Sequence, residues 1–143
     1  MLSSQQLHKI PVISLIPQRA PMVMLSRVVA YSKGKIQTEL DIETGNIFVS
    51  HDLFSESGML ENIAQTAAAM VGLEAREVGE EVPLGFIGGI NKVKVVGLAA
   101  ASQTITTHVE ILQEVFNINL IRGKCFILDE LLMECEMKIV TNP

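Results

Sequence analysis

The chain has 143 residues, which is enough for one compact domain with a buried core and too few for two. Hydrophobic residues make up 48% of it and charged residues 19%, so its composition is typical of globular proteins and not of disordered chains. The formal net charge of −5 leaves no basic excess for a phosphate backbone. We therefore expect a single domain over residues 1–143 and no nucleic-acid partner.

Residues 1–6 lack the cationic start of a secretory signal, and no apolar run approaches the ~20 residues of a membrane span. We therefore expect a cytoplasmic protein with no membrane partner. In that compartment Cys125 and Cys135 are expected to be reduced core residues. Three scattered histidines, two cysteines without ligand spacing and the absence of a phosphate-cradling glycine motif predict no metal and no cofactor.

The first third of the chain predicts a helix followed by a β-hairpin. Residues 5–14 favour a short helix that ends before Pro17, because a residue that precedes proline avoids helical backbone angles. The apolar run 22–31 and the alternating run 35–43 predict two strands joined by a turn at Lys33-Gly34. Residues 47–57 then predict a loop.

The next segment predicts a long helix that is apolar almost all round. Its sequence around residues 59–73 places Glu61 and Gln65 on one face, one turn apart. A carboxylate in such surroundings is costly unless it is paired, so Glu61 is hydrogen-bonded, neutralised, or lines a cavity. Ser55 or Ser57 would cap this helix, and Gly72 or Gly79 would end it.

Four strands are predicted after Pro83, over residues 84–96, 102–116, 117–128 and 131–140, and their short connections make them antiparallel. Gly88-Gly89 predicts a bulge in the first. In the second, core positions alternate with a polar face that carries His108; the predicted core positions are Ile105, Val109, Ile111 and Val115. The order predicts an α+β fold, an antiparallel sheet around one central helix. The apolar helix needs cover on both sides, so we expect a dimer.

Two stretches resemble a known family. Residues 15–28 (LIPQRAPMVMLSRV) resemble the opening motif of FabA/FabZ-type 3-hydroxyacyl-(acyl carrier protein) dehydratases, Leu-Pro-His-Arg-x-Pro, apolar residues, then Asp-Arg-Val. Gln18 stands where the family has His, and Ser26 where it has Asp. Residues 48–65 resemble the family's Gly-His-Phe-Pro-Gly loop and Glu-Ala-x-Ala-Gln helix, most closely at Glu61, Ala64 and Gln65. The resemblance runs from about residue 12 onward and implies the hot-dog fold.

The resemblance also implies a reaction. In the family, the loop His of one subunit faces the helix Glu of the other. It therefore suggests His51 as the base and Glu61 as the acid that dehydrate a 3-hydroxyacyl thioester. His51 either matches the family's His or only falls near it, because the interval of 10 residues to Glu61 is about four residues shorter than in the family.

Further site residues follow from that mechanism. N–H groups near Gly58 would polarise the thioester carbonyl, and Gln65 would orient Glu61 or the substrate hydroxyl. Phe54 and Asn62 are further candidates for substrate contact. For Glu61 and Gln65 the alternative is a polar cluster that fixes the dimer register, and for His51 it is a loop imidazole without chemistry.

The expected substrate is an acyl thioester on acyl carrier protein or coenzyme A, in fatty-acid or polyene-type biosynthesis. The expected assembly is a homodimer, a higher homo-oligomer or a heterodimer. Two other functions stay open. One is a thioesterase of the same fold, in which Glu61 or Asp52 activates water; the other is a non-catalytic dehydratase-like subunit that pairs with an active paralogue.

Overall fold

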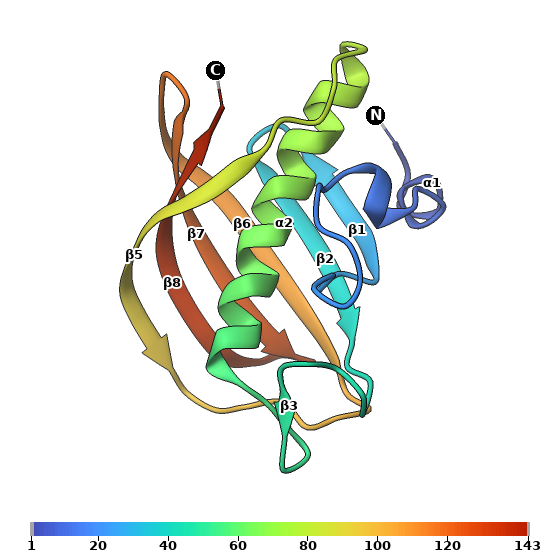
Figure 1. The fold of residues 1–143 in the computed structure, drawn as a ribbon, viewed down its shortest axis with the longest axis vertical. Helices are drawn as coiled ribbons and strands as arrows, with labels where there is room; N and C mark the ends of the chain where they lie inside the picture. The colour runs from blue at the N-terminus through green and yellow to red at the C-terminus, as the bar shows by residue number, and fades with distance from the viewer. Residues whose placement is uncertain (1, 143) are drawn as a thin grey trace.

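A long helix lies against a curved antiparallel sheet at the centre of the computed structural model, which describes residues 2–142 (Figure 1). The helix, α2, spans Glu56–Glu77. The six-stranded sheet has the order β1-β2-β6-β7-β8-β5. Its strands are β1 (Arg27–Ser32), β2 (Lys35–Asp41), β5 (Gly85–Val95), β6 (Thr104–Val115), β7 (Ile118–Ile127) and β8 (Glu130–Thr141). The smaller elements are α1 (Ser4–His8), a 3-10 turn (Val12–Ser14), β3 (Val49–Ser50) and β4 (Leu53–Phe54).

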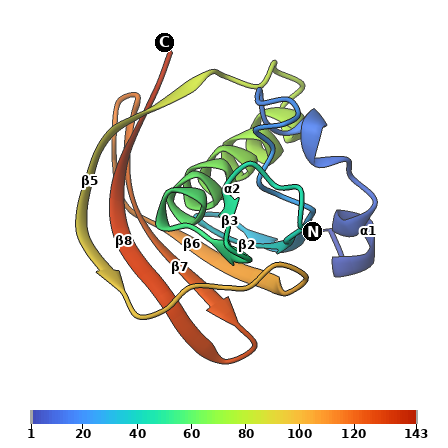
Figure 2. The same cartoon turned by 60° about the horizontal axis from the view of Figure 1, so that its bottom comes forward.

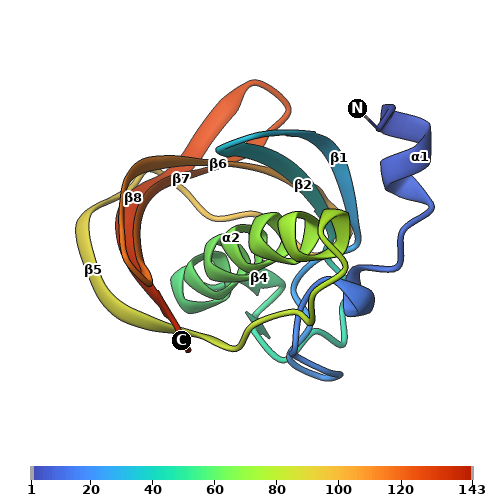
Figure 3. The ribbon, with the colours of Figure 1, turned by 90° about the horizontal axis from the view of Figure 1, so that it is seen from above.

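The sheet bends around α2, as the views from below and from above show (Figures 2 and 3). Every strand pair is antiparallel, and β1 and β5 form the two edges. The predicted hairpin and the four late strands are therefore confirmed. A register shift between Ile87 and Gly89 confirms the predicted bulge. Among the described residues, no helix is long and apolar enough to cross a membrane.

The predictions fail at several points between residues 5 and 57. The single helix over residues 5–14 is wrong, because α1 ends at His8 and Pro11 precedes a separate turn. The strand predicted to start at Met22 begins only at Arg27. Residues 22–24 bond to side chains of α2 instead of to a neighbouring strand. The loop predicted over residues 47–57 contains the short β3–β4 hairpin and the start of α2.

Ser55 caps α2, because its hydroxyl accepts the Gly58 N–H at 3.2 Å. The helix ends just before Gly79, whose φ of +72° suits glycine. Gly72 lies inside the helix and has a different role: a Cβ there would come 2.1 Å from the carbonyl oxygen of Leu15. Glycine therefore lets the N-terminal connection pack directly on the helix.

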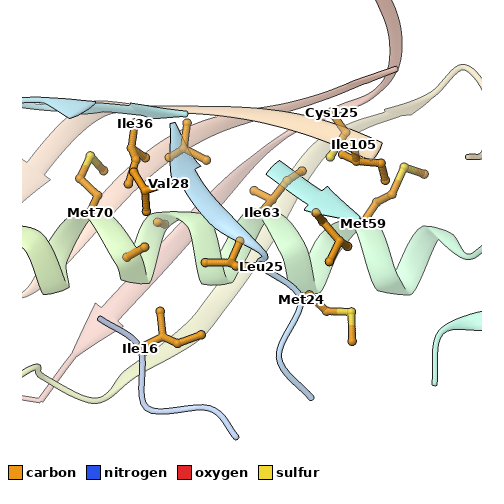
Figure 4. Close-up of a cluster of buried hydrophobic side chains, with 14 of the residues drawn as sticks. Ile16, Met24, Leu25, Val28, Ile36, Met59, Ile63, Met70, Ile105 and Cys125 are labelled. Atoms are coloured by element: carbon orange, nitrogen blue, oxygen red, sulfur yellow. The ribbon is translucent and has the colours of Figure 1, made fainter. Parts of the chain in front are cut away.

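The core fills the space between α2 and the concave face of the sheet and continues to the N-terminal connection, whose Ile16 and Met24 lie on the other side of the helix (Figure 4). Ile63 packs so close to the sheet that a Cβ at Gly123 would lie 2.3 Å from its Cγ2 atom. Both cysteines are free and buried, as predicted. Val115 is not a core residue and is 46% exposed, because a bulge between Ile111 and Gln113 turns the end of β6 over.

Candidate functional site

Glu61 and Gln65 form a hydrogen-bonded pair on α2. The Gln65 amide nitrogen lies 2.7 Å from a Glu61 carboxylate oxygen and 2.7 Å from the Met22 carbonyl oxygen. The Gln65 carbonyl oxygen accepts the Met24 N–H at 2.6 Å. Gln65 is fully buried, whereas Glu61 is half-buried. Glu61 was expected to be hydrogen-bonded, neutralised or beside a cavity, and the structure shows a hydrogen bond. Its partner, Gln65, is itself bonded to the backbone of Met22 and Met24.

Asn62 lies beneath this pair in a buried polar network. Its amide nitrogen donates to the Met24 carbonyl oxygen at 2.8 Å, and its amide oxygen accepts the Thr107 hydroxyl of β6. The Thr66 hydroxyl donates to the Asn62 carbonyl oxygen and lies 2.8 Å from the Thr38 hydroxyl of β2. These bonds set the position of α2 against two strands and against the segment that holds Gln65.

The segment Met22–Met24 was not recognised as part of the site from the sequence. It connects to the site only through bonds to Gln65 and Asn62, which lie about forty residues later in the chain. Its local pattern is an apolar run and resembles a buried strand. The contacts are between side chains and backbone, so no periodicity in the sequence signals them.

His51 lies at the tip of the β3–β4 hairpin, which extends beyond the N-terminal end of α2 (Figure 1). His51 and Asp52 form its turn with φ values of +53° and +63°. The His51 side chain is exposed, and the only polar partner of its ring within the described chain is the Ser50 hydroxyl, at 3.1 Å from Nδ1. The structure therefore gives no hydrogen bond between His51 and Glu61 of the same chain.

Gly58 and Phe54 support the start of α2. The Gly58 N–H is occupied by the Ser55 cap. The Phe54 ring is fully buried and packs edge-on against Phe48, with centroids 6.3 Å apart, and a Cβ at Gly58 would come 2.6 Å from it. Contact of substrate with these residues or with the buried Asn62 stays a prediction.

A strip of α2 next to Glu61 is only partly covered by the rest of the chain. Its half-buried residues recur at helical spacing and are Leu60, Ala64, Ala68 and Val71. The free edge strand β5 also leaves apolar side chains uncovered: Ile87, Ile90 and Val95 are 42%, 37% and 45% exposed. These three pair with buried β8 residues, so they point to the concave face. The strip of α2 beside Glu61 and the edge strand β5 thus both leave apolar side chains partly exposed in one chain.

Among the described residues, no group of three or more His, Cys, Asp and Glu side chains gathers in a way that would hold a metal ion.

Comparison with known proteins extends these observations. The family model of ApeP-like proteins, described as ApeP dehydratase, matches residues 10–143. The 3-hydroxyacyl-[acyl-carrier-protein] dehydratase FabZ of Syntrophotalea carbinolica is 22% identical in an alignment of 143 positions that covers 96% of each chain.

Solved structures share the fold. A chain of the dehydratase heterocomplex ApeI:P from Xenorhabdus doucetiae superposes with a TM-score of 0.88 at 18% identity, over 94% of this chain and 92% of that one. Cj0977, a sigma28-regulated virulence protein from Campylobacter jejuni, superposes with a TM-score of 0.72 at 11% identity, over 98% and 92%.

These matches confirm the hot-dog fold and the predicted relationship to FabA/FabZ-type dehydratases. The departures at Gln18, Ser26 and the His51 loop mark this dehydratase-like protein as a divergent relative of FabZ. Since the family model extends over nearly the whole chain, the protein belongs to the ApeP-like dehydratase family.

Proposed function

We propose that this protein is a subunit of a dehydratase for 3-hydroxyacyl thioesters and that Glu61 protonates the departing hydroxyl group. One observation carries the proposal: the half-buried Glu61 carboxylate is held at 2.7 Å by Gln65, whose amide is anchored to the Met22 and Met24 backbone. A general acid needs a fixed orientation toward the group that it protonates. Gln65 supplies that orientation.

The reaction removes water across two carbons. A base takes the proton from Cα, the electron pair forms the Cα–Cβ double bond, and the C–O bond at Cβ breaks as Glu61 delivers its proton to the hydroxyl. The FabZ relative is named for substrates on acyl carrier protein, and we propose the same carrier here. Coenzyme A thioesters have the same reacting atoms and serve as test substrates.

We propose that a second hot-dog subunit completes the site. It would cover the half-buried strip of α2 and the free edge of β5, whose apolar side chains are exposed in one chain. Burying these surfaces would also exclude water around Glu61, which strengthens its electrostatic interactions. The ApeI:P structure is a complex of two different chains, and this supports a heteromeric assembly beside a homodimer.

The base is proposed to come from that second subunit and not from His51. If Phe48 is matched with the Phe of the family's Gly-His-Phe-Pro-Gly loop, Ile47 takes the place of His. The interval to Glu61 then becomes 14 residues, and the loop is no longer shortened. This match fits a His51 whose ring bonds only to Ser50 in the described chain. With this match, the chain carries the proposed acid, Glu61, but has Ile47 at the position of the family's His.

Glu61→Gln tests the proposed acid. The variant keeps the shape and the Gln65 contact but has no proton to deliver, so we expect turnover of a 3-hydroxyacyl thioester to fall by ~100-fold or more. Glu74→Gln, more than three turns further along α2, is the matched control and should keep the wild-type rate. The assay follows the enoyl thioester product for the chain alone and for its complex with a co-expressed hot-dog paralogue. Equal rates for Glu61→Gln and wild type in both assays would remove Glu61 from the chemistry.

A further inference from the structure

The convex face of the sheet carries a hollow that the proposed reaction does not use. Its volume is about 370 Å³, within the usual range of small-molecule sites. Small side chains of β1, Ala30 and Ser32, line it beside long polar side chains of β2, β6 and β7, which are Lys35, Gln37, His108, Glu110, Arg122 and Lys124. Neighbours of these residues in β2 and β6, such as Thr38 and Thr107, face α2. The hollow therefore lies on the side of the sheet opposite Glu61.

Among the polar side chains of this hollow, groups that can donate hydrogen bonds outnumber carboxylates. The hydroxyl of Ser32, the amide of Gln37, the imidazole of His108 and three cationic groups all offer protons. Glu110 is the one carboxylate in the lining, and its oxygen already lies 3.5 Å from Arg122. A lining with three cationic groups and a single carboxylate, which already contacts Arg122, favours an anionic ligand.

Two cationic side chains of the lining, those of Lys35 and Lys124, remain able to bind such a ligand. Lys35 pairs with Glu110 in the strand register, but among the described residues no carboxylate comes within 4.0 Å of its ammonium group. Lys124 has only a long contact of 4.0 Å, to Glu134. Arg122, in contrast, contacts both Glu110 and Glu136 and is held in place by them.

His108 lies between these cations. Its ring packs edge-on against Phe126, with centroids 5.1 Å apart, and it is the cross-strand neighbour of Lys124. Burial, and then the charge of Lys124, lower the pKa of His108 below its usual value. The charge of Lys124 therefore acts on the His108 ring.

We infer that this hollow binds a small organic anion that carries a phosphate monoester or carboxylate group, with Lys35 and Lys124 as the charged contacts. The remainder of the ligand would lie over Ala30 and Ser32, where the short side chains leave space. The site is independent of the proposed dehydratase chemistry, because none of its residues contacts Glu61 or Gln65 through the hydrogen bonds described above.

Ring-proton NMR of the three histidines tests the inference on the intact protein. Glycerol 3-phosphate is the phosphate probe and citrate the carboxylate probe. We expect at least one probe to shift the His108 signals saturably, while the signals of His8 and His51, which lie outside the hollow, stay fixed. A response to one probe alone identifies the preferred anionic group.

Charge-removing variants show where the anion binds. Lys35→Gln and Lys124→Gln should each weaken binding by about tenfold, since hydrogen bonds to charged groups contribute about that much. Lys94→Gln, on β5 and outside the hollow, is the matched control and should bind like wild type. The inference is wrong if neither probe saturates the His108 shift up to about 10 mM, above the ordinary range for small metabolites. It is equally wrong if all three variants bind alike.

Discussion

At the residue scale, Gln65 uses every polar atom of its amide on partners from two parts of the chain. It bonds to the Met22 and Met24 backbone and to Glu61, so the carboxylate and the N-terminal connection are held by one side chain. The bond to the Met24 backbone is buried, where leaving it unmade is expensive, and the bond to the Met22 backbone is partly buried. The orientation of Glu61 therefore depends on residues forty positions earlier.

Gly123 sets how closely the sheet approaches the helix. A methyl group there would lie 2.3 Å from the Cγ2 atom of Ile63, far inside contact distance. We expect Gly123→Ala to lower the free energy of unfolding by about 1–3 kcal/mol through overpacking. Urea denaturation measures this. Gly45→Ala, where nothing lies near the added Cβ, is the control, and equal midpoints for the two variants would contradict the tight approach.

The two buried thiols should make the free energy of unfolding depend on pH in the alkaline range. Burial raises the pKa of Cys125 to about 12 and that of Cys135 to about 11, from an ordinary value of 9.0. Above that ordinary value the unfolded chain loses these protons while the folded chain keeps them. The free energy of unfolding should therefore fall as pH rises from 9 toward 12. Urea denaturation at pH 8.5 and pH 10.5 measures the fall, and Cys125→Ala should reduce it. An identical slope for the variant would exclude this contribution.

At the element scale, the sequence predicts the features that depend on contacts between residues close together in the chain. Helical spacing places Glu61 and Gln65 one turn apart, so their pairing was predictable from the sequence. The four late strands were also predictable, because alternation of residues and short connections decide them. The start of β1 was not, because side chains of α2 bind residues 22–24.

Contacts between distant segments also explain why the site was predicted only in part. The Gly58 N–H was expected to be free, but Ser55 occupies it as the cap of α2. Asn62 was expected to lie beside the substrate, but the fold places Thr107 and Met24 around its amide. Neither contact follows from periodicity, because each depends on which segment the fold brings next to the helix.

The edge strand β5 carries the prediction about assembly. Its concave-face side chain Ile90 is 37% exposed and lies opposite the buried Met137 of β8. A lysine there would place a charge in the proposed subunit contact, so Ile90→Lys should dissociate the assembly and leave the fold intact. Sedimentation velocity with circular dichroism measures both. His108→Lys on the convex face is the control, and unchanged assembly of Ile90→Lys would exclude β5 from the contact.

At the scale of the whole molecule, the proposed acid and the loop histidine lie in different places. Glu61 lies on the helix beside a half-buried apolar strip, whereas His51 lies at an exposed hairpin tip. One chain holds an oriented carboxylate without a basic partner at hydrogen-bonding distance among its described residues. A second subunit would supply the cover and the base together, which is why catalysis and assembly are expected to depend on each other.

Dehydration rates for His51→Ala and Ile47→His, measured on one 3-hydroxyacyl thioester beside wild type, test this division of roles most directly. Ile47 is 49% exposed, so the loop has room for an imidazole there. We predict that His51→Ala keeps the wild-type rate. Ile47→His should raise the rate of the chain assayed without a paralogue by ~100-fold, which is the lower end of the usual contribution of a general base. A ~100-fold loss in His51→Ala, with no gain in Ile47→His, would contradict it and make His51 the base.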